Sequence, residues 1–321
     1  MRRKLITIRD VAERAGVSMS TVSHVLNRND HHVSAARREM ILAAVEELGY
    51  RPNTVARNLA TRRAGAIGIV CNIATDPDSL DMAFLAAILT TVSEMGRRVM
   101  LIPADDQQIQ EVALDHAVDG MVFLDERVSD PRIADLLEMG MPAGGLWSNH
   151  LAAALYQGGE ELALHLESRG HQRVICMCGP SDELFVAKFK RMVADTLQAY
   201  GIALTFYHCP PNTEAEIAQS IAHEAREQRA TAIIASSDKL AINAIRGLHL
   251  ARLRVPEDCA VTGFGDVSAA QWVQPPLTTI RVPVSAVARW AVSQVLSDGL
   301  LDDRQAMNGV ASGRLIVRRS C

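Results

Sequence analysis

From about Ala64 onward, short apolar runs alternate with longer segments of helical periodicity, and this alternation constrains the fold more than any other feature of the sequence. The runs have the length and continuous hydrophobicity of strands covered on both faces, which is typical of parallel sheets. They lie at 66–71, 98–103, 119–124, 173–178, 204–209, 231–236 and 259–264, with helical patterns at 79–95, 182–200, 213–228 and 238–251. The span is long for one open sheet. We therefore expect an α/β domain of two lobes with parallel, doubly wound sheets, and a ligand cleft at the carboxyl ends of the strands.

The charge is distributed unevenly along the chain. Residues 1–63 hold 12 Lys and Arg against 6 Asp and Glu, a net charge of +6, whereas the remainder holds 21 against 31, a net charge of −10. A compact basic segment beside an acidic body is typical of a polyanion-binding module joined to a domain with another ligand. Charge alone leaves open a solvated basic face with no partner.

The first fifty residues show three short helical patterns. Thr7 and Asp10 have capping-box spacing, and Gly16 ends the first helix after a short run. Ser18 can cap a second helix that runs to about Asn27, and Ser34 can cap a third that ends at Gly49. Two short helices joined by a turn of about three residues predict a helix-turn-helix headpiece over residues 1–50.

The second helix has one narrow apolar stripe, formed by Val22, Val25 and Leu26. Its other side chains are short or slender and none is acidic, which suits insertion into the major groove of DNA. An idle surface helix would ordinarily carry Lys and Glu. The residues expected on this DNA-facing side are Met19, Ser20, Ser23, His24 and Asn27.

Residues 51–63 read either as a plain linker or as a hinge helix that orders against a partner. Asn53 can cap a helix of about two turns, which is not stable alone in water. The apolar pair Val55 and Leu59 is unusual for a linker, and leucine is a suitable wedge for a base step in the minor groove.

Other classes of protein are disfavoured by what the sequence lacks. There is no apolar run of eighteen residues and no apolar signal segment in MRRKLITIRD, so we expect a cytoplasmic protein without a membrane partner. The six cysteines are scattered, and we expect them to be reduced and buried. His31-His32 has no third ligand nearby, so no metal and no cofactor are expected. Phosphate-binding glycine motifs and a nucleophile elbow are also missing, which argues against an enzyme.

The sequence resembles the LacI/GalR family of bacterial transcription factors over nearly its whole length. The likeness is strong in TIRDVAERAGVSMSTVSHVLN (7–27), VSAARREMILAAVEELGYRPN (33–53) and VARNLAT (55–61). It continues in LESRGHQRVICMCGP (166–180), SSDKLAINAIRGL (236–248), VPEDCAVTGFGD (255–266), PPLTTIRVP (275–283) and RLIVRR (314–319), and is weakest between about 72 and 160.

The resemblance implies a headpiece (1–50), a hinge helix (51–63) and a two-lobed effector-binding and dimerisation domain (64–321) that is similar to periplasmic sugar-binding proteins. It also implies a homodimer on a pseudo-palindromic double-stranded DNA operator. Met19, Ser20 and His24 match base-reading positions, and Leu59 matches the minor-groove wedge. The resemblance also implies a set of residues that lie near DNA phosphates: Thr7, Ser18, Thr21, Ser23, Asn27, Ser34 and Asn53. We add Arg57 from the basic hinge.

The chain departs from the family pattern at several positions. His24 stands where Arg is most common, and a neutral His offers one hydrogen bond where Arg offers a bidentate pair. In the body, an Ala-rich segment (150–159) replaces a common Asp, Lys190 replaces an effector-binding Arg, and Gly265 replaces an Asp. These changes put a sugar or purine effector in doubt and favour a different effector, such as one with an anionic group facing Lys190, or weak ligand control. Our candidate effector-binding residues are Lys190, Ser237, Asp238 and Asp266, although Asp238 reads better as a helix N-cap than as a ligand.

The favoured function is therefore a sequence-specific transcriptional regulator, with repression as the expected mode. Two alternatives remain: a small-molecule binding protein with vestigial DNA binding, and an enzyme built on the α/β lobes. The chain ends directly after the RLIVRR segment, which leaves no heptad tail for a tetramer, so we expect a homodimer.

Overall fold

The structure is a computed structural model of the 321-residue chain. It describes residues 6–26, 33–50, 63–72, 80–127, 129–146, 149–179, 184–209, 214–296 and 313–321. The chain divides into two compact units, Met1–Ala64 and Gly65–Cys321. Of the expected hinge segment, only Arg63 is among the described residues, so the hinge stays a prediction.

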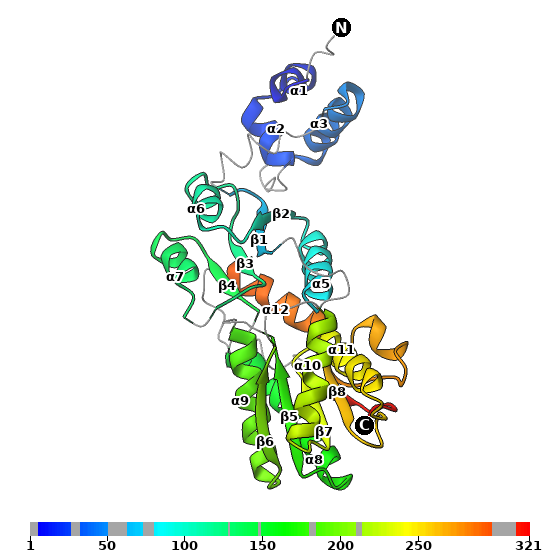
Figure 1. Ribbon diagram of the computed structural model, residues 1–321. Coiled ribbons are helices and arrows are strands. Elements are labelled where there is room, and N and C mark those ends of the chain that lie inside the picture. The colour runs from blue at the N-terminus through cyan, green and yellow to red at the C-terminus, as the bar shows by residue number, and fades with distance from the viewer. Residues whose placement is uncertain are drawn as a thin grey trace. The chain divides into compact units, whose positions relative to one another are not determined.

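The described part of the first unit consists of α1 (Ile8–Ala15), α2 (Met19–Leu26) and α3 (Ala35–Leu48) (Figure 1). Thr7 and Asp10 form the capping box at the start of α1. Gly16 and Gly49 end α1 and α3 in the left-handed conformation, with φ of 61° and 62°. These caps and ends are as the sequence predicts.

The three helices enclose a small core. Val11, Val22 and Ile41, one from each helix, have no exposed surface. The apolar stripe expected on α2 therefore faces inward, with Val25 buried and Leu26 partly buried against the same cluster. Burial of each such side chain contributes roughly 1.5–3 kcal/mol, which matters greatly in a unit of this size.

The first lobe of the second unit has a parallel four-stranded sheet in the order β2-β1-β3-β4. The strands are β1 (Ala66–Cys71), β2 (Arg98–Pro103), β3 (Met121–Phe123) and β4 (Ala143–Gly145). Its helices are α5 (Leu80–Glu94), α6 (Asp106–Leu114), α7 (Pro131–Glu138) and, from much later in the chain, α12 (Val284–Leu296), which packs on α5, β3 and β4.

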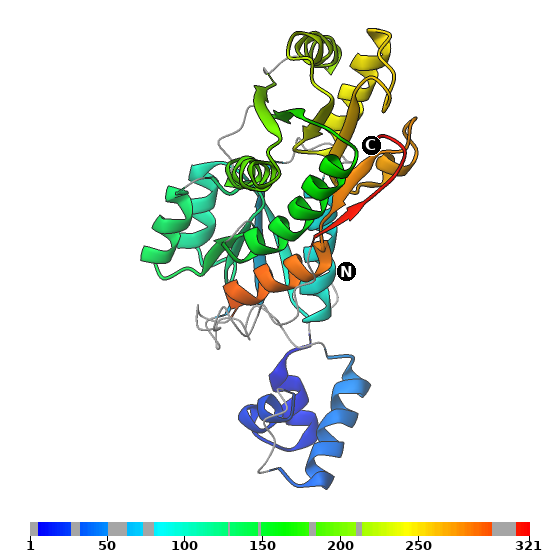
Figure 2. The same cartoon turned by 90° about the horizontal axis from the view of Figure 1, so that it is seen from below.

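The second lobe has a six-stranded sheet in the order β10-β9-β8-β7-β5-β6, parallel except for the β9–β10 pair (Figures 1 and 2). The strands are β5 (Arg173–Cys178), β6 (Ala203–His208), β7 (Ala232–Ala235), β8 (Ala260–Gly265), β9 (Thr278–Arg281) and β10 (Arg314–Ile316). The helices are α8 (Asn149–Ser168), α9 (Leu184–Ala199), α10 (Glu214–Glu227), α11 (Asp238–Leu250) and the 3-10 turn η1 (Ser268–Gln271).

The predicted parallel sheets are confirmed, and the seven predicted strands are present with ends shifted by at most two residues. Two strands were not predicted: β9, and β4, which reads Ala-Gly-Gly and has no hydrophobic period. β4 is a strand because it pairs with β3. This pairing depends on the tertiary structure, so the β-propensity of the three residues does not predict it. Within the described residues, no helix is long and apolar enough to span a membrane.

Candidate nucleic-acid interface and effector site

The N-terminus of α2 carries a cluster of hydroxyl groups. Ser18 caps the helix by accepting a hydrogen bond from Thr21 N–H at 3.2 Å. Its Oγ also lies 2.8 Å from Ser20 Oγ and from Thr21 Oγ1. A capped helix N-terminus with exposed hydroxyls offers donors at its positive end, which suits contact with a phosphate.

The outward face of α2 carries the expected base-reading positions. Met19 is 46% exposed, and Ser20 and His24 are also exposed. Thr21 and Ser23 are half-buried at the edge of this face. Since Val22 and Val25 hold the opposite side in the core, the same helix can pack inward and present slender, non-acidic side chains outward.

The remaining residues predicted to contact DNA differ in their hydrogen bonding and in whether the structure describes them. The hydroxyl of Thr7 donates to Asp10 Oδ2 at 2.6 Å, as part of the capping box. Ser34 occupies the N-cap position of α3 but makes no capping bond with its side chain, so the expected cap there is wrong in that respect. Asn27, Asn53, Arg57 and Leu59 lie outside the described residues, as does the pair His31-His32.

Ser237 and Asp238 lie at the start of α11, at the carboxyl end of β7. Ser237 is the N-cap, accepting from Leu240 N–H at 3.2 Å, so the expectation that Asp238 caps this helix is wrong. The Asp238 side chain accepts from Thr279 Oγ1 at 2.5 Å and from Val267 N–H at 2.7 Å. Burial raises the pKa of this carboxyl group, and the bond from Thr279 partly opposes that shift.

Asp266 follows β8 and has a positive φ of 54°. One carboxylate oxygen accepts from Arg281 Nε and the other from an Arg318 NH2 group, each at 2.6 Å. Both carboxylate oxygens therefore already accept hydrogen bonds from guanidinium groups, one from β9 and one from the segment after β10. An effector role for Asp266 stays a prediction.

Lys190 projects from α9 toward the edge strand β6. Its Nζ lies 3.2 Å from His208 Nε2 and 5.9 Å from the centre of the Phe206 ring. Beneath α9, the thiols of Cys176 and Cys178 are buried and 3.6 Å apart. The bond from Cys176 and the nearby charge of Lys190 lower the pKa of Cys178, against the effect of burial.

Two further groups lie at the strands' carboxyl ends and were missed in the sequence analysis. The rings of Phe185, Phe189 and Phe264 pack in tilted and edge-on arrangements, with ring centroids 5.1–5.7 Å apart. In the first lobe, burial raises the pKa of Asp81, and the charge of Asp125 adds to the shift. The i, i+4 spacing of Phe185 and Phe189 was the available signal, because side chains at that spacing share a helix face.

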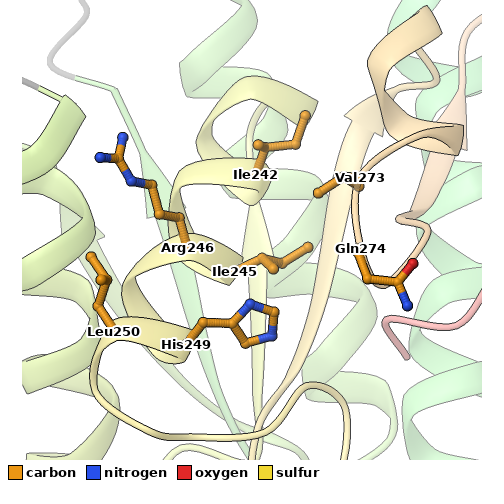
Figure 3. Close-up of a pocket in the computed structure, with 7 residues that line it drawn as sticks. All are labelled: Ile242, Ile245, Arg246, His249, Leu250, Val273 and Gln274. Carbon is orange, nitrogen blue, oxygen red and sulfur yellow. The ribbon is translucent and has the colours of Figure 1, made fainter.

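An apolar groove of about 340 Å³ lies on the second lobe, away from the start of α11. In it, side chains from the later part of α11 face the segment after η1 (Figure 3). Leu250 is 70% exposed at its edge, and the neighbouring Trp272 is 78% exposed. The lining residues are Ile242, Ile245, Arg246, His249, Leu250, Val273 and Gln274.

Among the described residues, no group of three or more His, Cys, Asp or Glu side chains could hold a metal ion, and all six cysteines are free and buried.

Comparison with known proteins identifies two regions of the chain. Residues 7–53 match the family described as bacterial regulatory proteins, lacI family, and residues 163–321 match a periplasmic binding protein-like domain. The two matches follow one another in the order that the resemblance implies. The chain therefore carries a lacI-family region followed by a periplasmic binding protein-like domain.

Curated LacI-family relatives align with almost the whole chain. The ribose operon repressor of Escherichia coli K12 is 28% identical over 91% of this chain and 92% of its own length. The transcriptional repressor PurR of Photobacterium profundum is 28% identical over 98% of both.

Solved structures of LacI-family proteins share the fold. The lac repressor dimer bound to operator and an anti-inducer has a TM-score of 0.79, with 24% identity over 99% of each chain. The complex of the regulator CelR with cellobiose has a TM-score of 0.64, with 23% identity over 98% of this chain and 100% of the other.

Proposed function

We propose that this LacI-family protein is a transcriptional repressor that binds a pseudo-palindromic DNA operator as a homodimer and responds to a small molecule held between the lobes. The observation that carries this proposal is α2, which buries Val22 and Val25 while exposing Met19, Ser20 and His24. The basic charge of residues 1–63 and the names of the curated relatives support it. We propose that it acts in the bacterial cytoplasm, because the chromosomal DNA it would bind is there.

On this proposal, α2 enters the major groove and reads bases with three side chains. Met19 offers apolar contact to a thymine methyl group, Ser20 offers a hydroxyl, and His24 offers one hydrogen bond. The phosphate contacts come from Thr7, Ser18, Thr21, Ser23 and Ser34, with Asn27, Asn53 and Arg57 added from outside the described residues. Leu59 serves as the minor-groove wedge.

We assign the apolar groove on α11 to the homodimer, with a second copy of this chain as its occupant. An apolar groove with the exposed Leu250 in its lining is typical of an interface, and Trp272, which precedes the lining residue Val273, is exposed as well. A two-fold axis would place the same face of both copies together, and the fold neighbour described as a lac repressor dimer supports this assembly.

The dimer assignment can be tested with charge substitutions. Leu250→Glu should shift the protein to monomer in light scattering, whereas Leu164→Glu on α8, where leucine is 53% exposed, should not. A dimer that survives Leu250→Glu and Trp272→Glu together would overturn the assignment.

The effector site is proposed at the carboxyl ends of the strands, with Lys190, Ser237, Asp238 and Asp266 at its border. The bonds that Asp238 and Asp266 already make limit what they can offer a ligand. Lys190 is the better candidate for a direct contact, because a cation beside His208 suits an anionic group. A thermal-shift screen of anionic metabolites, with Lys190→Met as the control, tests this part separately.

The DNA-binding function is tested by fluorescence anisotropy on genomic fragments from beside the gene and on random duplex of equal length. The proposal predicts tight, fragment-specific binding with a steep dependence on salt, because basic side chains release counterions from phosphates. Ser20→Asp should abolish it. Equal affinity for all duplexes would favour the binding protein with vestigial DNA binding, in which ligand-dependent behaviour survives deletion of residues 1–63. An enzyme on the lobes would instead reveal itself by turnover of a ligand found in the screen.

A further inference from the structure

Cys176 and Cys178 form a pair of thiols inside the second lobe. Both lie on β5 and belong to the hydrophobic cluster that includes the buried side of α9, whereas Met177 between them belongs to the cluster on the other face of the sheet. Neither cysteine has exposed surface, and their sulfur atoms are 3.6 Å apart. The strand therefore brings two soft, buried ligand atoms together on one face.

The backbone of β5 keeps these two thiols from closing a disulfide. Residues two apart on a strand have Cα atoms about 6.6–6.8 Å apart and parallel side chains, whereas a disulfide needs Cβ atoms about 3.5–4.5 Å apart. β5 pairs with β6 on one side and with β7 on the other, so it cannot buckle without breaking both sets of hydrogen bonds. A covalent bridge between the two sulfur atoms therefore needs a further atom.

A metal ion has the size that such a bridge requires. At a metal–sulfur bond length of about 2.3 Å, two sulfur atoms on one ion lie about 3.8 Å apart at a tetrahedral angle and about 4.6 Å apart in a line. The observed separation of 3.6 Å is close to this range, and rotation about the two Cα–Cβ bonds supplies the remaining opening. Thiolates are soft ligands, which favour soft ions such as copper(I).

The number and charge of the ligands restrict the ion further. Within the part of the chain that the structure describes, no group of three or more His, Cys, Asp or Glu side chains could hold a metal ion, so the pair acts there with two ligands, whereas structural zinc almost always has four. The bond from Cys176 lowers the pKa of the Cys178 thiol, burial opposes this, and the charge of Lys190 lowers it further. A univalent ion held by two thiolates has a net charge of −1, which the Lys190 cation offsets.

We propose that Cys176 and Cys178 bind one soft univalent metal ion of the copper(I) class as a two-coordinate complex. Binding forms two metal–sulfur bonds and releases both thiol protons to solvent, with no change in oxidation state. The site rests on the geometry of the thiols and not on the proposed function. Since Lys190 is also a candidate effector residue, we expect a metal-loaded chain to bind an anionic effector more weakly.

Silver(I) is the probe, because it has the charge and the two-coordinate preference of copper(I) without its redox chemistry. Native mass spectrometry of the full chain in excess glutathione, a competing monothiol, should show one retained silver ion. The second thiol acts at a high effective concentration, so Cys176→Ala and Cys178→Ala should each lower the affinity for silver roughly 100-fold. Cys209→Ala and Cys259→Ala are the matched controls, because their thiols are also buried, and both should keep the ion.

X-ray absorption on the silver-loaded native chain needs no variant and should show two sulfur neighbours, while circular dichroism checks that each variant is folded. Lys190→Met should weaken silver(I) binding more than mercury(II) binding, because the mercury(II) complex of two thiolates is neutral; equal effects on both ions would overturn the role of Lys190. Loss of silver from the native chain to glutathione, or its retention by folded Cys176→Ala or Cys178→Ala, would overturn the site. Because no DNA is present, the result is independent of whether the protein prefers an operator.

Discussion

The packing of α2 predicts that two substitutions two residues apart will fail in different ways. Val22→Asp puts a carboxylate where the side chain has no exposed surface, whereas Ser20→Asp puts the same group on the exposed face. The first substitution should unfold the headpiece, and the second should leave it folded but unable to bind DNA.

The magnitude follows from burial and from the size of the first unit. Losing a fully buried valine costs roughly 1.5–3 kcal/mol, and burying an unpaired carboxylate costs several kcal/mol more. A unit of about 64 residues, Met1–Ala64, has a total stability of roughly 3–10 kcal/mol at typical values per residue. The loss is therefore comparable to the whole free energy of unfolding of the headpiece.

Hydrogen exchange measured by mass spectrometry on the full chain separates the two outcomes. Peptides from α1 to α3 should lose protection in Val22→Asp, while peptides from Gly65–Cys321 serve as an internal control. Ser20→Asp should keep wild-type protection throughout and lose DNA affinity through repulsion from phosphates. Wild-type protection of α2 in Val22→Asp would refute the assignment of its inward face.

Three further outcomes test other parts of the structure. His24→Arg should keep the fold and change the preferred base pair at one operator position by about 1–3 kcal/mol, since Arg can bind guanine bidentately; equal operator preferences in a competition assay would mean that His24 does not read bases. Burial raises the pKa of Asp130, but bonds from Arg132 outweigh this and lower it, so its stabilisation is present above the unfolded pKa near 3.8 and is lost as pH falls below it. Asp130→Asn should cost about 1–3 kcal/mol in urea unfolding at pH 7, because Arg132 keeps its pair with Asp125, and should flatten the loss of stability as the pH falls below about 3.8; an unchanged slope would contradict this. Gly247→Ala would drive a Cβ into the backbone of α10 and should cost roughly 1–3 kcal/mol in the same assay, whereas Gly144→Ala, with nothing within 4 Å, should be nearly neutral.

The sheets were predictable because continuous apolar runs of strand length repeat along the chain, and period and length are local properties. The caps at Thr7 and Gly16 were predictable for the same reason, as each depends on residues within one turn. β4 was not, because only its pairing with β3 makes Ala143–Gly145 a strand.

The surroundings of the candidate effector residues were less predictable than the headpiece, because they depend on partners that are distant in the sequence. Ser237 and Asp238 are adjacent in sequence, and only the position of Thr279 and Val267 makes one a cap and the other a buried acceptor. The contact of Glu126 with α9 joins segments about sixty residues apart and has no sequence signature. Contacts between such distant segments can be identified only from the tertiary structure.

The most direct test of the central claim is selection of binding sites from a random duplex library with the purified full chain. We expect enrichment of one two-fold symmetric motif, and a shifted base preference at matching positions in both half-sites when His24→Arg is used. A library that shows no enriched sequence after selection, with the headpiece folded, would contradict the claim that this chain is a sequence-specific DNA-binding regulator.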